Sequence, residues 1–264
     1  MESDANINLT LIVFLLALFP LLGFWGKVGP LVTRLGVPQK LALWLNPYFT
    51  VKHEILFRVI RGTIYTVTAI VISFALLSFF DLNTSELFKT WNADFILITL
   101  IGALTQASLS IFFSQLMFFF VLRSANIGQE MGNVGWISSI QSLPMRLQVI
   151  MVSMGSMSEE FLFRGALLIV FTSAFGINPF IAILLVTLFF IYQQIIQVNT
   201  LAQALVITSG SLTISLVGSL MFFYTENILS AMIAHASSII FYVCIPKEHW
   251  GRDQGPTTVT SASG

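Results

Sequence analysis

The stretch at residues 158–165 reads Ser158-Glu159-Glu160-Phe161-Leu162-Phe163-Arg164-Gly165. It places three charged side chains inside an apolar run that extends over about residues 147–172. Each of these charges costs about 2.5–3.5 kcal/mol at the centre of a membrane-spanning helix on insertion scales. The run is long enough to cross a bilayer, so the stretch predicts a transmembrane helix that carries a functional site.

The spacing of the three charges separates their roles. Glu160 and Arg164 are four residues apart, so they share one helix face and can pair. Glu159 points about 100° away from Glu160 and has no partner on its own helix. A buried carboxylate of this kind is a candidate general base that activates water. The alternative is a structural ion pair that helps the helices to pack, with Glu159 satisfied by a hydroxyl or an amide.

The composition supports a membrane protein. Of the 264 residues, 56% are hydrophobic and 9% are charged, and 25 are Phe. A soluble domain carries about 25% charged residues. The formal net charge of zero gives no sign of a nucleic-acid partner, and the single cysteine excludes a disulfide within the chain.

Continuous apolar runs indicate helices, because hydrocarbon cannot satisfy an open backbone. A transmembrane β-barrel would instead show alternating segments of about ten residues. The runs cover approximately residues 7–25, 63–80, 95–122, 147–172, 179–197, 201–222 and 227–244. The predicted fold class is therefore all-α, a polytopic transmembrane bundle of about seven spans. The first span is expected to be retained rather than cleaved as a signal peptide, because acidic residues and no basic ones precede it.

The distribution of basic residues predicts the orientation of this integral membrane protein. Between the first two spans lie Lys27, Arg34, Lys40, Lys52, Arg58 and Arg61. The next connection is mainly acidic, and basic residues return at Arg123, Arg146, Lys247 and Arg252. We therefore expect the N-terminus outside and the C-terminus in the cytoplasm.

Three segments are expected along the chain. Residues 1–146 hold the N-terminal helices and the basic cytoplasmic loop, in which residues 28–56 are expected to form short amphipathic pieces at the interface, with a re-entrant segment as the alternative. Residues 147–245 form a core of four helices. Residues 246–264 are a polar tail that is expected to be disordered.

Three short motifs in the core resemble those of the CAAX protease and bacteriocin-processing (CPBP or Abi) family of intramembrane endopeptidases. The first is the Glu-Glu-x-x-x-Arg motif already described, and the resemblance extends over residues 148–245. Phe190 and Gln194 match a Phe-x-x-x-His pattern except that Gln replaces His. His235 and Ile239 match a His-x-x-x-Asn or Asp pattern except that Ile replaces the polar residue. These departures affect the expected activity more than the expected fold.

The resemblance implies a hydrolase that cuts a membrane-anchored peptide or a lipidated protein. By position, Glu159, Glu160, Arg164, Gln194 and His235 are the expected catalytic residues, with Glu159 activating water. A Gln amide can donate a hydrogen bond to an oxyanion, but it cannot carry a proton.

Phe190 and Ser238 are expected to line the substrate cavity, and Ser238 could partly replace the polar group missing at Ile239. No cofactor is required by this scheme. A catalytic zinc usually has three protein ligands, and the chain offers three only if Glu159, Glu160 and His235 all converge.

Two other functions compete with an attenuated protease. A proteolytically inactive relative could use the same cavity to scaffold or regulate a membrane protein partner. A proton-coupled transporter is the third hypothesis and ranks last, because the sequence shows no inverted repeat. The predicted partners are thus the lipid bilayer and a membrane peptide or protein, without nucleic acid.

Overall fold

The chain folds into a bundle of helices. The computed structural model describes residues 2–49, 51–89, 93–122 and 127–244, and no strand is formed in that part of the chain. The α-helices are α1 (Glu2–Arg34), α2 (Val37–Leu45), α3 (His53–Phe79), α4 (Ala93–Met117), α5 (Ile127–Gly132), α6 (Gly135–Gln141), α7 (Met145–Glu160), α8 (Pro179–Ile195), α9 (Leu201–Thr225) and α10 (Ile228–Val243). Short 3₁₀ turns lie at Asn46–Tyr48 and Thr84–Leu87, and π-helical segments lie at Phe118–Leu122, Phe161–Leu167 and Val170–Ala174. The predicted all-α class is confirmed.

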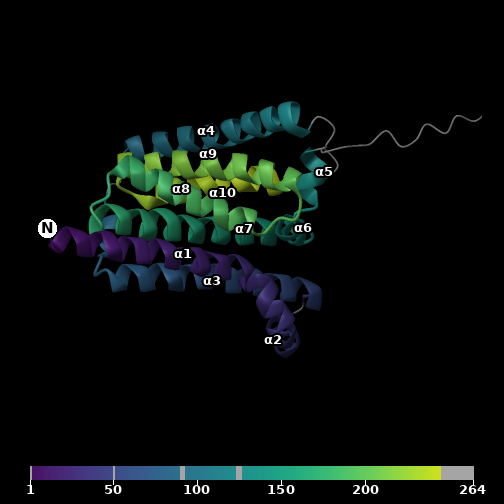
Figure 1. Ribbon diagram of the computed structural model, residues 1–264. Helices are drawn as coiled ribbons and strands as arrows, with labels where there is room; N and C mark the ends of the chain where they lie inside the picture. Colours follow the sequence, from purple (N-terminus) through teal and green to yellow (C-terminus); the bar gives the residue numbers. More distant parts are fainter. Residues whose placement is uncertain (1, 50, 90–92, 123–126, 245–264) are drawn as a thin grey trace, which may run out of the picture.

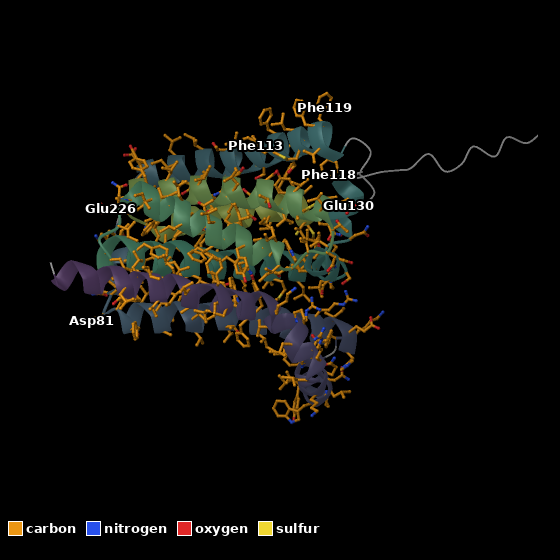
Figure 2. The ribbon with its side chains drawn as sticks, viewed as in Figure 1. Asp81, Phe113, Phe118, Phe119, Glu130 and Glu226 are labelled. Atoms are coloured by element: carbon orange, nitrogen blue, oxygen red, sulfur yellow. The ribbon has the colours of Figure 1, made fainter. Side chains whose placement is uncertain are left out.

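Each predicted apolar run overlaps one of the seven long helices, α1, α3, α4 and α7–α10, and the run at 147–172 continues beyond α7 into the two π-helical segments that follow it. The helices α1, α3, α4 and α9 each contain a segment that is long and apolar enough to cross a membrane. Helices α8 and α10 are shorter but also apolar. Large apolar side chains are exposed on the bundle, for example Leu104, Phe119 and Phe180, which are 70%, 73% and 74% exposed. Phe119 is labelled among them in Figure 2. Such a surface is stable against lipid and not against water. The protein is an integral membrane helical bundle, and the count of seven spans stays a prediction.

The long helices lie side by side along one axis (Figure 1). Helix α4 covers one side of the bundle, against α9 and α10, and α1 and α3 cover the opposite side, against α7 and α8. Asp81 and Glu226 lie at one end of the bundle and Glu130 at the other (Figure 2). The side of the membrane on which each end lies stays a prediction, and the C-terminal tail at 246–264 falls outside the described residues.

The first helix is longer than the sequence suggested. The first apolar run covers approximately residues 7–25, but α1 continues to Arg34 with Pro20 and Pro30 inside it. Packing of α1 against α3 and α8 supports this extension. Residues 28–56 thus contain the end of α1, all of α2, a 3₁₀ turn and the first turn of α3, and α2 projects from one end of the bundle (Figure 1).

The helix that carries the acidic motif changes its winding at that motif. It is α-helical as far as Glu160 and continues as a π-helical segment from Phe161 to Leu167. Wider π turns inside helices are often found at functional sites. Polar caps fix the starts of α8 and α10: Asn178 accepts a hydrogen bond from the backbone N–H of Phe180 at the start of α8, and Asn227 accepts one from Leu229 at the start of α10.

Candidate active site

Glu159 faces a cavity inside the bundle. The cavity has a volume of about 580 Å³ and receives residues from α1, α3, α4 and α5–α10. Among the described residues, Glu159 is the only acidic one that lines it. Its side chain is 12% exposed, so the carboxylate is mostly enclosed but still reaches the cavity.

Three other helices supply polar groups to this carboxylate. The Tyr65 hydroxyl of α3 donates a hydrogen bond to Glu159 Oε1 over 2.7 Å. Gln194 Nε2 of α8 donates to the same oxygen over 3.0 Å. On the other side, His235 Nε2 of α10 lies 3.9 Å from Glu159 Oε2, which is too far for a direct hydrogen bond. One carboxylate oxygen is therefore held by two donors, and the other faces an imidazole across a gap.

Tyr65 is the site residue that the sequence did not reveal. Its hydroxyl oxygen accepts a hydrogen bond from Gln193 Nε2 over 2.8 Å while its proton goes to Glu159. The Tyr65 ring stacks on Trp25 of α1, with ring centroids 4.7 Å apart, and the Trp25 indole N–H donates to the Tyr65 carbonyl oxygen. The only sequence signal was a phenol inside a predicted span, which gives no indication of its partner 94 residues away.

A fully buried ion pair lies next to these cavity-lining residues but does not itself line the cavity. Glu160 and Arg164 are both inaccessible, and Arg164 Nη1 lies 3.1 Å from Glu160 Oε1. The pair predicted from the four-residue spacing is therefore present. The Arg164 guanidinium also lies over the ring of Phe190, 4.9 Å from its centroid, a cation–π geometry that helps to compensate a buried charge.

His235 connects the buried pair to the cavity. Its Nδ1 lies 2.8 Å from Glu160 Oε1. A carboxylate can only accept in such a contact, so Nδ1 carries the proton. In the neutral ring, Nε2 then presents its lone pair toward Glu159. Glu160 thus fixes the orientation and the tautomer of the imidazole, as carboxylates do for functional histidines.

The predicted site residues do not all line the cavity. Glu159, Gln194, His235 and Phe190 line the cavity, whereas Glu160 and Arg164 do not. Ser238, expected to line the substrate cavity, is buried and does not line it. It donates to the carbonyl of Ala234 and lies within hydrogen-bond distance of α4, because its helix face turns toward that helix. Ile239 lines the cavity instead and adds an apolar surface.

The described residues do not form a set of metal ligands. No group of three or more His, Cys, Asp or Glu side chains is arranged to hold a metal ion in that part of the chain. Glu159 and His235 face the cavity, but Glu160 is directed to Arg164 and to His235 Nδ1. Because a catalytic zinc usually needs three protein ligands, these residues do not fit one.

The comparison with protein families agrees with the motifs. Residues 141–240 match the family model described as type II CAAX prenyl endopeptidase Rce1-like. No curated protein and no solved structure matches the chain. The match covers α7, α8, α9 and most of α10, with most of the site, and it confirms the resemblance to the CAAX protease family over that segment. Tyr65 and the rest of α1–α4 lie outside it.

Proposed function

We propose that the protein is an intramembrane endopeptidase that hydrolyses a peptide bond of a membrane-anchored or lipidated substrate, with Glu159 as the base. The match of residues 141–240 to a prenyl endopeptidase family supports a protease within the membrane. The observation that carries the assignment to Glu159 is its position as the one acidic residue, among those described, that lines the 580 Å³ cavity.

The gap between Glu159 and His235 suits a water molecule. Two hydrogen-bond acceptors 3.9 Å apart repel each other unless a donor lies between them. A water at about 2.8 Å from both atoms would donate one proton to each. Such a water is held against the carboxylate that is proposed to deprotonate it.

The chemical steps then use this chain's own groups. Glu159 takes a proton from the water as the oxygen of that water attacks the carbonyl carbon of the substrate. The tetrahedral oxyanion accepts a hydrogen bond from the second N–H of Gln194, whose first N–H holds Glu159. Glu159 finally gives its proton to the leaving nitrogen as the C–N bond breaks.

The test is cleavage by the purified protein in proteoliposomes, on a panel of membrane peptides with and without a prenyl group. Glu159→Gln should lower kcat by at least about 10²-fold, because removal of a general base typically costs 10²–10⁴-fold. Glu54→Gln is the matched control, since Glu54 is an exposed acid on α3 that does not line the cavity. A Glu159→Gln protein that cleaves at the unaltered rate would disprove the proposal.

A scaffold function is the second candidate. Gln194 stands where the family pattern has a His, which can carry a proton, and Ile239 stands where it has Asn or Asp. Both side chains line the cavity. If neither the unaltered protein nor Gln194→His cleaves any peptide of the panel, while Glu159→Gln retains full activity in cells, the cavity serves binding alone.

A further inference from the structure

Helix α4 carries polar side chains on two different faces. Gln106, Ser110 and Ser114 are buried within the bundle, where α4 packs against α9 and α10. Ser108 and Gln115 are instead exposed. Seven residues are close to two full helical turns, so these two side chains lie on one outward stripe of the helix.

This outward stripe faces the apolar part of the membrane. Ser108 is at the middle of the candidate span Asp94–Val121, and seven residues of α-helix place Gln115 about 10 Å from it. Both positions are within about 15 Å of the middle of the span, which is half the thickness of the hydrocarbon core. Leu104 precedes Ser108 by one turn on the same stripe and is 70% exposed. The two polar side chains are therefore surrounded by lipid tails, which form no hydrogen bonds.

Neither polar side chain of the stripe is satisfied within the part of the chain that the structure describes. Ser108 and Gln115 form no hydrogen bond or ion pair there. Other hydroxyls of the spans differ, because Thr99 of α4 and Thr213 of α9 donate to the carbonyl four residues earlier. An unpaired carboxamide in hydrocarbon is costly, and a polar group from another membrane helix would remove that cost.

The stripe borders the cavity that contains Glu159. Gln115 lines this cavity although it is exposed, and Ile111, one turn earlier, lines it as well and is 41% exposed. Helix α4 is the outermost helix on its side of the bundle (Figure 1). The cavity therefore reaches the outer surface beside α4, and a helix lying along the stripe would be next to its entrance.

We propose that the outward stripe of α4 binds the transmembrane helix of a substrate protein through neutral polar side chains of that helix. This inference rests on the proposed endopeptidase function and names its substrate class as proteins anchored by a membrane-spanning helix. The partner side chain is Asn, Gln, Ser or Thr, because α4 has no charged residue after Asp94 and amide and hydroxyl groups both donate and accept. The contact of Gln115 with both the lipid and the cavity favours a substrate over a second copy of the chain, since only a substrate must pass from the membrane to Glu159.

The test is a double-mutant cycle between the protein and a helix-anchored peptide substrate in proteoliposomes. The substrate helix carries Leu throughout its centre, or one Asn at each of four consecutive central positions in turn. For at least one position, the unaltered protein should have a KM about 3- to 20-fold lower for the Asn form, as expected for one hydrogen bond between membrane helices. Gln115→Leu should remove this preference, Gln115→Asn should keep part of it, and Ser108→Leu should reduce it.

Ser78→Leu is the matched control. Ser78 is an exposed serine of α3, on the opposite side of the bundle from α4, and it does not line the cavity. This variant should keep the full preference for Asn. A preference that Gln115→Leu leaves intact, or that Ser78→Leu removes to the same extent, would overturn the proposal.

Binding to the Glu159→Gln variant separates this inference from the proposed catalysis. Energy transfer from a labelled protein to a labelled substrate helix in liposomes should show tighter binding of the Asn form, and additional Gln115→Leu should abolish the difference. If this holds while the unaltered protein cleaves no peptide, the helix site stands and the protease assignment fails. If the unaltered protein cleaves the Leu form and all four Asn forms with equal KM, the helix site is wrong and the protease stands.

Self-association is the competing use of the stripe. Two differently labelled copies of the protein should show no energy transfer that depends on Gln115. If Gln115→Leu abolishes energy transfer between copies and leaves the preference for Asn unaltered, a second copy covers the stripe and the proposal is wrong.

Discussion

Replacing Tyr65 by Phe removes one hydroxyl and retains the ring. The hydroxyl donates to Glu159 Oε1 over 2.7 Å and accepts from Gln193 over 2.8 Å. A hydrogen bond to a charged group contributes about 1.5–3 kcal/mol. If the bond orients the base in the transition state, its loss lowers kcat about 10- to 100-fold. The stacking on Trp25, with centroids 4.7 Å apart, should persist because it involves the ring alone.

The same substitution also carries a structural cost that can be measured separately. The buried Gln193 amide loses its acceptor, which should reduce the free energy of unfolding by about 1–3 kcal/mol. Thermal unfolding in detergent reports this change, and steady-state cleavage reports kcat and KM. An effect on kcat with KM nearly unaltered would identify Tyr65 as a positioning residue rather than a substrate contact.

Tyr192→Phe is the matched control for Tyr65→Phe. The Tyr192 hydroxyl donates to the carbonyl of Phe19 over 3.4 Å, on the outer side of α8, and Tyr192 does not line the cavity. Its removal should leave kcat unchanged. If Tyr65→Phe cleaves as fast as the unaltered protein, or if both substitutions slow cleavage equally, the assignment of Tyr65 to the active site is refuted.

Three further predictions concern the second motif, the buried ion pair and the topology. Gln194→His restores a group that can carry a proton and should raise kcat by up to about 10²-fold in the same assay; an unchanged or lower kcat would show that the site does not use that position for proton transfer. Gly218→Val should lower the free energy of unfolding by about 1–3 kcal/mol through overpacking, because a Cβ at Gly218 lies 3.3 Å from the buried carboxylate of the motif. A Cβ at Gly210 on the same helix meets nothing within 4 Å, so Gly210→Val should unfold at a higher temperature than Gly218→Val, and equal losses would contradict the packing argument. Single cysteines at the exposed Ser85 and Ser138, in a cysteine-free background, should react with an impermeant reagent on intact cells at position 85 only, and the reverse pattern would invert the predicted orientation.

The resemblance and the structure agree best where chemistry is local in sequence. The spacing of Glu160 and Arg164 predicted a pair, and the two side chains lie 3.1 Å apart. The absence of a partner for Glu159 on its own helix was also predictable, since 100° separates adjacent residues. The partners of Glu159 on other helices were not predictable in the same way. The tertiary structure identified them as Tyr65 of α3, Gln194 of α8 and His235 of α10.

The sequence by itself determined the membrane-embedded all-α class, because a chain with 9% charged residues cannot cover itself with a solvated surface and its backbone must be satisfied within helices. It also determined where the long helices lie, apart from the extension of α1. The tertiary structure decided which polar side chains meet, because helix rotation and packing are set by contacts between residues far apart in sequence. Ser238 turned toward α4 and Ile239 toward the cavity, and Arg61 came to share that cavity with Glu159. The hydropathy of an apolar helix does not depend on how the helix is rotated about its axis. Only the packed bundle therefore shows which of its faces points to the cavity.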